Sequence, residues 1–348
     1  MKALLLSAFF LFTFGLFNIL GIRRDLLLNE VLYVIIGFGL YFIVRSIGRH
    51  FFRINSYLFY WLFIGMLIVT FLIGIEANGS RRWIDLYFLK LQGSEIFKPF
   101  FILFFADFLS KKHARVKQGA IFLLSFLYFV LPAVIIFKQP DLGNALVYVS
   151  VYLVMIFFSP LPKRYFFYMI GFFLLAAPLG WMFMHDYQRA RVLSFLNPGL
   201  DTGGNSYNMI QSMITVGSGQ FAGKGLGLGT QSRLLFLPEN HTDFAFSSLV
   251  EQFGFLGGFA VLMCFLALFL SQLRRIFNFF YRKDEDSVQS FLYIIGFFSY
   301  FLFQTIINIG MNMGLFPIAG IALPFISYGG SAVVAIMIGL ALLPSKQS

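Results

Sequence analysis

Long apolar runs recur along the whole chain and constrain its fold more than any other feature. A helix needs about 20 consecutive, mostly apolar residues to cross a bilayer. Ten candidate segments can be marked, at residues 3–21, 31–48, 55–75, 95–110, 118–137, 142–160, 165–184, 244–272, 290–312 and 318–343. The alternating pattern of a membrane β-barrel is absent from the sequence. We therefore predict an all-α integral membrane protein with about ten transmembrane helices, forming a single polytopic domain over residues 1–348.

Charge is scarce, and its placement limits the partners. Only 12% of the 348 residues are charged, whereas soluble domains are about 25% charged. The net charge of +11 comes from basic residues in short loops between the apolar runs. This placement predicts contact with membrane lipid and no nucleic-acid partner. The single cysteine, Cys264, excludes a disulfide within one chain.

The distribution of basic residues favours an orientation in the cytoplasmic membrane with both termini in the cytoplasm. Residues 185–243 then form a large extracytoplasmic loop between the seventh and eighth helices. Arg23, Arg24, Asp25 and Glu30 lie in a short outer loop, where we expect them to be solvated.

A second outer loop, at residues 76–94, is unusually basic for its predicted side. It contains Arg81, Arg82 and Lys90 beside Trp83, an aromatic residue of the kind found at membrane interfaces. Two interpretations stay open: an interfacial loop anchored by the tryptophan, or a cationic surface that docks an anionic lipid headgroup.

Glu95 and Lys98 follow this loop at the start of an apolar run. Their spacing places them on one face of a helix, where they can form an ion pair. The pair is either structural or functional, because ionisable residues at membrane depth are costly. Asp141, in a turn marked by Pro140 and Gly143, is more simply predicted to cap the following helix.

The longest polar interruption is the glycine-rich stretch 217–243. Gly223-Lys224 does not match a Walker phosphate loop. Consecutive glycines nevertheless let backbone N–H groups approach an anion. Lys224 and Arg191 are therefore candidate phosphate ligands. Upstream, the spacing from Met209 to Ile214 predicts a short amphipathic helix.

Asp243 ends this stretch, directly before the apolar run 244–272. It is either the N-cap of the next helix or a working acid/base. The capping-box position holds Phe246 instead of Glu or Gln, and the local sequence leaves the two roles equally supported. His241 is expected to be a structural neighbour of Asp243.

Prolines and glycines interrupt the last apolar region, at Pro317 and Pro324 among others. Such interruptions indicate a broken helix that lines a cavity. The predicted polar lining consists of Asn308, Asn312, Ser327 and Tyr328.

Four blocks in this order resemble the SEDS family (shape, elongation, division and sporulation), which includes RodA and FtsW. They are GSRRW at 79–83 with SEIFK at 94–98, QPDLG at 139–143, GSGQFAGKGLGLGTQS through FLPENHTDF at 217–244, and NIGMNMGL through LPFISYGGS at 308–331. The third block leans towards the RodA branch. Glu251-Gln252 departs from the usual Glu-Glu pair.

This resemblance implies a ten-helix peptidoglycan glycosyltransferase that polymerises lipid II into β-1,4 glycan strands at the outer face of the cytoplasmic membrane. Its partners would be lipid II, undecaprenyl-linked glycan and a class B penicillin-binding protein. Asp243 matches the family's essential aspartate, the candidate general base that deprotonates the acceptor hydroxyl. Trp83, Glu95 and Lys98 match further functional positions of the family.

The lipid diphosphate that leaves needs cations more than a proton donor. Lys98, Arg81 and Arg82 are the first candidates, followed by Arg191 and Lys224. A divalent cation (Mg or Mn) is the alternative, with no metal ligand assigned and no other cofactor expected. His241 and Ser327 complete the candidate substrate-binding residues.

The rival function is a flippase that moves lipid-linked peptidoglycan precursors. A flippase needs access from both sides, whereas the ionisable residues that flank the spans cluster on the predicted outer side. This asymmetry favours an enzyme. A purely structural membrane partner would leave Asp243 and Glu95 without a role.

Overall fold

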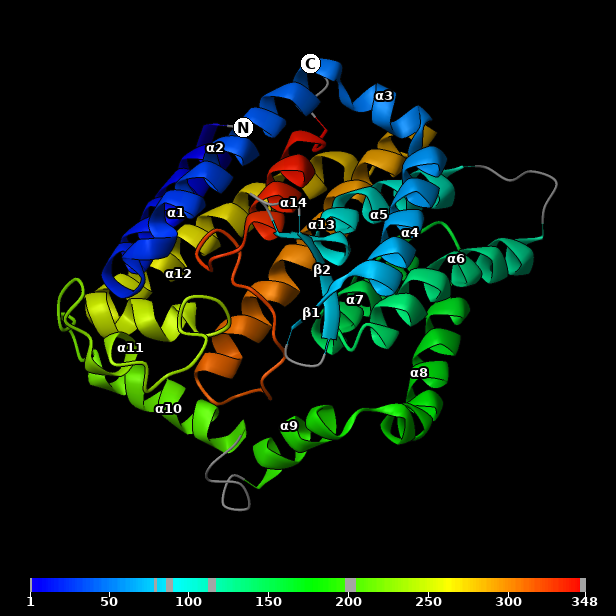
Figure 1. Ribbon diagram of the computed structural model, residues 1–348. Helices are drawn as coiled ribbons and strands as arrows, with labels where there is room; N and C mark the ends of the chain where they lie inside the picture. The colour runs from blue at the N-terminus through cyan, green and yellow to red at the C-terminus, as the bar shows by residue number, and fades with distance from the viewer. Residues whose placement is uncertain (1, 78–79, 86–89, 112–116, 198–204, 345–348) are drawn as a thin grey trace. The chain divides into compact units, whose positions relative to one another are not determined.

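A computed structural model describes residues 2–77, 80–85, 90–111, 117–197 and 205–344 (Figure 1). The described residues form mostly helices. The first eight are α1 (Lys2–Ile22), α2 (Arg24–Ile47), α3 (Arg49–Ile54), α4 (Ser56–Ile73), α5 (Gly93–Ser110), α6 (Gln118–Lys138), α7 (Leu142–Phe158) and α8 (Arg164–Phe183). The others are α9 (Asp186–Leu196), α10 (Asn205–Ser218), α11 (Thr230–Arg233), α12 (Ala245–Phe280), α13 (Glu285–Asn312) and α14 (Gly330–Ala341).

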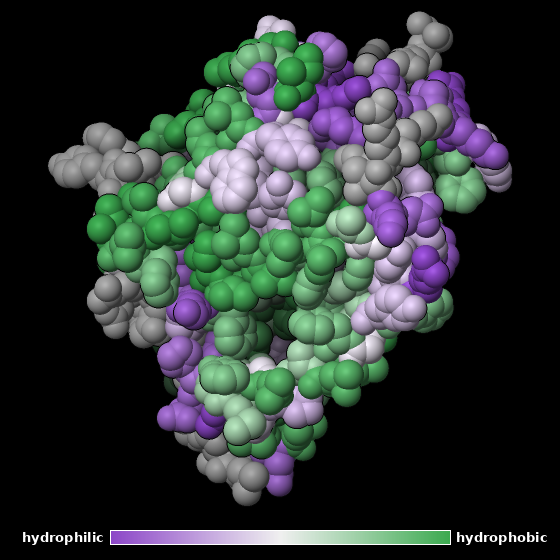
Figure 2. All heavy atoms as spheres, turned by 90° about the vertical axis from the view of Figure 1, so that its right-hand side faces the viewer, coloured by the Kyte–Doolittle hydropathy of each residue, from purple (hydrophilic) through white to green (hydrophobic). Residues whose placement is uncertain are grey.

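Seven helices in this part of the chain are long and apolar enough to cross a membrane, namely α1, α2, α4, α6, α8, α12 and α13. Apolar side chains also cover much of the face seen in Figure 2. The predicted all-α membrane fold is therefore confirmed. Three further predicted spans hold α5, which contains three charged residues, and the shorter apolar helices α7 and α14. The number ten remains a prediction.

The helix in the last predicted span, 318–343, is shorter than predicted, whereas the interruption predicted from Pro317 and Pro324 is confirmed. Residues 313–329 are not helical, and α14 begins only at Gly330. Pro317 lacks the N–H that a helix needs, and Pro324 likewise prevents a continuous helix through this region.

Contacts between residues divide the chain into two compact units. The first unit contains Met1–Ile36, Met184–Ser271 and Leu302–Val333, and the second contains Gly37–Phe183, Gln272–Phe301 and Val334–Ser348. Each unit thus combines three stretches that are far apart in the sequence.

A small sheet in the second unit replaces the loop predicted at 76–94. Strands β1 (Ile75–Ala77), β2 (Ser80–Asp85) and β3 (Lys90–Gln92) pair antiparallel in that order. Trp83 lies opposite Ile75 on one side and Gln92 on the other. Branched and aromatic residues such as Ile75 and Trp83 favour strands, and β3 leads directly into α5.

The long segment 185–243 in the first unit is largely helical where it is described. It contains α9, α10 and α11. The helix predicted over Met209–Ile214 is confirmed, because α10 includes these residues.

The glycine-rich stretch packs into a break in α12. Gly254 has φ 67° and ψ −168°, which interrupts the helix. The backbone groups freed there find partners in the loop, since Lys224 N–H donates to the Glu251 carbonyl at 2.9 Å and Phe255 N–H donates to the Gln220 carbonyl at 2.8 Å. A side chain on Gly223 would lie 2.2 Å from the Gln252 carbonyl oxygen, so this approach requires glycine.

Replacing Gly254 with alanine is therefore expected to destabilise the first unit. The new Cβ would meet the Gly223 nitrogen at 2.2 Å, and φ at this position is +67°. Such strain costs on the order of 1–3 kcal/mol in unfolding free energy. Thermal unfolding in detergent should show a lower midpoint, whereas Gly171→Ala in α8, where nothing lies within 4 Å, should not lower it. Equal midpoints for Gly254→Ala and wild type would contradict the strain argument.

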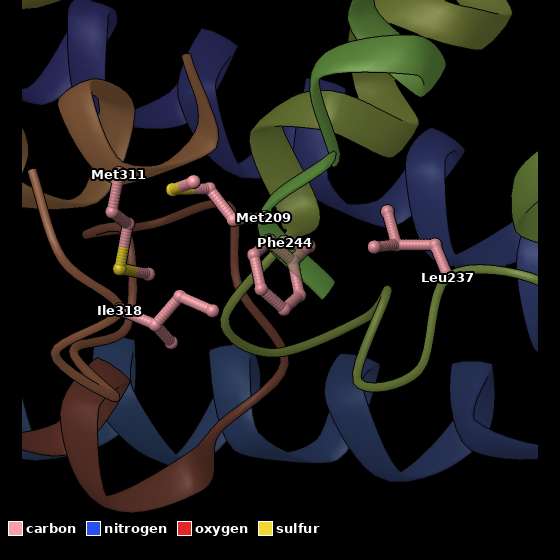
Figure 3. Packing of buried hydrophobic residues seen from close by; sticks show 5 residues of the cluster. All are labelled: Met209, Leu237, Phe244, Met311 and Ile318. Carbon is pink, nitrogen blue, oxygen red and sulfur yellow. The ribbon is translucent and has the colours of Figure 1, made fainter. Parts of the chain in front are cut away.

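A buried apolar cluster holds the first unit together around Phe244 (Figure 3). It brings four parts of the chain into contact: α10, the segment between α11 and α12, α13, and the non-helical segment 313–329. Its members are Met209, Leu237, Phe244, Met311 and Ile318. The residue that follows Asp243 is thus fixed in the core.

Candidate functional site

Asp243 lies in a turn whose backbone is held by two asparagines of α13. Its carbonyl oxygen accepts hydrogen bonds from Nδ2 of Asn308 at 3.1 Å and Nδ2 of Asn312 at 3.0 Å. The next helix begins at Ala245, and the Phe244 carbonyl accepts the N–H of Ser248 at 3.2 Å. Phe244 therefore occupies the N-cap position. This placement weighs against the capping interpretation of Asp243.

A buried polar network supports the two asparagines. Oδ1 of Asn312 accepts from the N–H of Ser247 at 3.0 Å and from its hydroxyl at 2.6 Å. The Ser212 hydroxyl of α10 lies 2.7 Å from the Ser247 hydroxyl and donates to the Asn312 carbonyl at 2.9 Å. Satisfied buried networks of this kind rigidify their surroundings, so the backbone at Asp243 is fixed from three helices.

The segment before α14 holds the same turn from the other direction. The Ser327 hydroxyl donates to the Thr242 carbonyl at 2.6 Å, and Tyr328 N–H donates to the His241 carbonyl at 2.8 Å. Asn308, Asn312 and Ser327 therefore contact the backbone around Asp243. Their predicted role as the polar lining of a cavity stays a prediction. The substrate-binding role of Ser327 stays a prediction.

Arg191 of α9 approaches the carboxylate of Asp243. A Cβ placed on Gly320 would lie 3.5 Å from Nη1 of Arg191 and 3.7 Å from Oδ2 of Asp243. The guanidinium and the carboxylate thus flank the same point, and glycine leaves that point free of a side chain. The structure brings together an acid and a cation that the sequence placed 52 residues apart.

His241 lies two residues before Asp243 and is half-buried. Its ring centroid is 5.7 Å from that of Tyr328. Burial lowers the pKa of the His241 imidazole, so the ring is neutral near pH 7. This environment fits the predicted structural neighbour.

Glu30 is a residue of this region that the sequence analysis misjudged. It was expected to be solvated, but it lies within α2 and is only 3% exposed. Its Oε2 accepts a long hydrogen bond, 3.4 Å, from the N–H of Gly329. Tyr33, one turn later, packs against Gly330, where a Cβ would lie 2.8 Å from its ring. The helix starts before the predicted boundary at residue 31, and Glu30 is on the side of α2 that contacts Gly329.

Lys224 contacts acidic and polar groups of the chain itself. Its Nζ lies 3.4 Å from Oε1 of Glu251 and 2.8 Å from Oγ1 of Thr230. The N–H groups of Gln231 and Ser232 also donate to the Glu251 carboxylate, each at 2.9 Å. The anion that these residues hold here is Glu251, and diphosphate binding by Lys224 stays a prediction.

The predicted ion pair between Glu95 and Lys98 is confirmed in the second unit. Nζ of Lys98 lies 2.7 Å from Oε1 of Glu95, and the two residues are 2% and 5% exposed. The ammonium also lies 5.1 Å from the centre of the Tyr300 ring. The other oxygen of Glu95 has no hydrogen-bond partner in the described part of the chain.

Asp141 caps α7 as predicted, because its side chain accepts from the N–H of Asn144. It also accepts from Nε2 of Gln92 at 2.9 Å, and Nη1 of Arg82 lies 4.0 Å away. Arg82 further donates to the carbonyls of Gln139 and Pro140. Arg82 therefore ties the sheet to the turn before α7.

Trp83 and Arg81 are the remaining predicted site residues of this second unit. Trp83 is half-buried on β2. The side chain of Arg81 lies outside the described residues. The described ranges contain no group of three or more His, Cys, Asp or Glu side chains that could hold a metal ion.

The predicted site residues thus fall into two sets. The first unit holds Asp243, Arg191, His241, Lys224 and Ser327, and the second holds Trp83, Arg81, Arg82, Glu95 and Lys98. Among the first set, the structure places the carboxylate of Asp243 and the guanidinium of Arg191 beside one point.

Comparison with known proteins identifies the family. The family model described as "Cell cycle protein", FtsW/RodA/SpoVE, matches residues 4–347. The chain belongs to this family, and the SEDS resemblance is confirmed. It is similar to the probable peptidoglycan glycosyltransferase FtsW of Buchnera aphidicola, with 34% identity over 90% of this chain and 88% of that protein.

A relative from the RodA branch, which includes MrdB, is similar to this chain as well. The peptidoglycan glycosyltransferase MrdB of Escherichia coli is 36% identical over 82% of this chain and 76% of that protein. The preference for the RodA branch therefore stays a prediction.

Solved structures share the fold. One, described as "Structural coordination of polymerization and crosslinking by a peptidoglycan synthase complex", contains a chain with a TM-score of 0.80 and 27% identity, covering 99% of this chain and 96% of that one. The rod shape determining protein RodA of Thermus thermophilus has a TM-score of 0.72 at 24% identity, covering 99% and 95%.

Proposed function

We propose that this protein is a peptidoglycan glycosyltransferase that polymerises lipid II into β-1,4 glycan strands. Two kinds of relative, FtsW and MrdB, are named peptidoglycan glycosyltransferases. The observation that carries the proposal is the geometry around Gly320, where the Asp243 carboxylate and the Arg191 guanidinium flank the position that a Cβ of residue 320 would occupy.

Asp243 acts as the general base. The acceptor hydroxyl attacks the anomeric carbon of the donor sugar, and its proton passes to the carboxylate. The bond from that carbon to the lipid diphosphate breaks, and the electron pair leaves with the diphosphate. A positioned base of this kind contributes about 10²–10⁴-fold to the rate. The backbone contacts to Asn308 and Asn312 keep the turn that carries this carboxylate in place.

Arg191 is the favoured cation for the diphosphate that leaves. Guanidinium binds phosphate oxygens through paired hydrogen bonds, and Nη1 of Arg191 flanks the same position at Gly320 as Oδ2 of Asp243. A divalent cation is also compatible with the site, because Mg²⁺ is often held by one or two carboxylates together with substrate phosphates. Asp243 would be its protein ligand.

The expected setting follows from the predicted orientation. The reaction takes place at the outer face of the cytoplasmic membrane, with both termini in the cytoplasm and residues 185–243 on the outer side. The partner is a class B penicillin-binding protein that crosslinks the strands. The similar solved structure, described as a peptidoglycan synthase complex that coordinates polymerisation and crosslinking, supports the proposal of this partner.

Proteoliposomes that contain the purified protein and labelled lipid II test polymerisation against flipping. We expect glycan strands on a gel, made by the protein alone or with its class B partner. Transport of intact lipid II across the bilayer, without strands in either condition, would contradict the proposal and favour the flippase.

Glu30 is expected to influence this reaction through the turn that it contacts. Glu30→Ala removes the acceptor for Gly329 N–H and should lower kcat roughly tenfold, the effect of losing about 1.4 kcal/mol, while KM for lipid II changes little. Glu30→Gln keeps an acceptor oxygen and should restore most of kcat. Asp25→Asn, an exposed acid on the same helix, is the control. Equal kcat values for Glu30→Ala and Asp25→Asn would contradict this role.

A further inference from the structure

Two arginines meet at the carboxyl end of α14 in the second unit. Nη1 of Arg45, in the last turn of α2, donates to the carbonyl oxygens of Ala341 at 3.3 Å and Leu343 at 3.1 Å. Nη1 of Arg275, in α12, donates to the Pro344 carbonyl at 3.3 Å. Leu343 and Pro344 are consecutive residues, so the two guanidinium groups lie close together.

Among the described residues, the charges at this position do not balance. The carboxyl end of a helix carries about half a negative charge, whereas the two arginines carry two positive charges. Neither arginine forms an ion pair with an acidic side chain in the described ranges. Each guanidinium has five N–H donors, and the bonds above engage one nitrogen of each. Within the part of the chain that the structure describes, an excess of positive charge and of donors therefore remains.

The surroundings indicate which anion would fit. Phe42, three residues before Arg45 and therefore on the same side of α2, is 64% exposed. Phe277, two residues after Arg275 in the sequence of α12, is 63% exposed. In a membrane, such side chains lie against acyl chains. An anion that carries acyl chains can contact the arginines and these apolar side chains at once, whereas a soluble anion contacts only the arginines.

We propose that Arg45 and Arg275 together bind the phosphate of an anionic phospholipid headgroup. The two guanidinium groups hold the phosphate oxygens through charge-assisted hydrogen bonds. The acyl chains follow the exposed apolar side chains of α2 and α12. In the predicted orientation this site faces the cytoplasmic leaflet, where anionic lipids are attracted by basic residues at helix ends.

The test measures phosphatidylglycerol binding to the full-length purified protein. Bound lipid is counted by native mass spectrometry after detergent exchange, and thermal unfolding is followed with phosphatidylglycerol, phosphatidylcholine or free glycerol phosphate. The double variant Arg45→Gln/Arg275→Gln is compared with Arg282→Gln/Lys283→Gln. This control removes the same charge from an exposed loop of the same unit. Arg45→Lys/Arg275→Lys keeps the charge but loses the paired hydrogen bonds.

Wild type should retain phosphatidylglycerol and be stabilised by it, but not by phosphatidylcholine or glycerol phosphate. The glutamine double variant should bind about tenfold more weakly or worse, and the lysine variant by less. If the glutamine variant does not fold, the lysine variant decides: weakened binding supports the site, and wild-type binding overturns it. Equal loss in the loop control, equal stabilisation by glycerol phosphate, or no preference for phosphatidylglycerol would also overturn it.

Discussion

Replacing Asp243 with asparagine is expected to lower the rate of glycan-strand synthesis by about 10²–10⁴-fold. Asparagine has nearly the same shape but cannot accept the proton of the acceptor hydroxyl. The contacts that hold this turn use the backbone carbonyl of residue 243, so they are kept in the variant. The fold should therefore survive while the reaction fails.

The measurement is the initial rate of strand formation from purified lipid II, with and without a class B penicillin-binding protein. Asp186→Asn in α9 makes the same chemical change at an exposed acid and should leave the rate unchanged. Thermal unfolding of each variant checks the fold. A well-folded Asp243→Asn protein that polymerises at the wild-type rate would show that Asp243 is not the base.

Breaking the ion pair in α5 is expected to have the largest effect on stability. Lys98→Met leaves the Glu95 carboxylate buried without its cation. Loss of one partner of a buried pair costs about 3–5 kcal/mol in unfolding free energy. The double variant Glu95→Gln/Lys98→Met removes both charges and should recover most of that loss.

The exposed pair of Arg23 and Asp25 provides the control. Their side chains are 37% and 59% exposed, so Arg23→Met should cost less than about 1 kcal/mol. Activity of the double variant then decides between the two interpretations of the buried pair. A stable double variant that polymerises normally shows a structural pair, and a stable but inactive one shows a functional pair. If Lys98→Met is as stable as wild type, the burial argument is wrong.

Much of the helical framework could be predicted because membrane helices are long apolar runs. The Glu95–Lys98 pair and the Asp141 cap were also predictable, since both depend on residues that are three apart in one helix or turn. The strands around Trp83 were missed because they are short. Their pairing also leaves no periodic pattern of apolar residues in the local sequence.

Contacts between segments that are distant in the sequence were the main features that could not be predicted. The four-residue spacing of Asn308 and Asn312 placed them on one face of a helix, but nothing in it showed that this face holds the backbone of Asp243. Gly254 stands in an apolar run, and the sequence did not show that the glycine-rich loop enters the helix there. The positions of Arg191 and Asp243 around Gly320 likewise depend on how α9 packs within the first unit.

Analysis of the product made from lipid II alone tests the central proposal most directly. The purified protein, with its class B partner added in a parallel reaction, is incubated with lipid II, and the product is digested with a muramidase that cleaves β-1,4 bonds. We predict strands of many disaccharide units that the enzyme reduces to single units. Lipid II that remains unpolymerised in both reactions, or a product that resists the muramidase, would contradict the assignment of this chain as a lipid II polymerase.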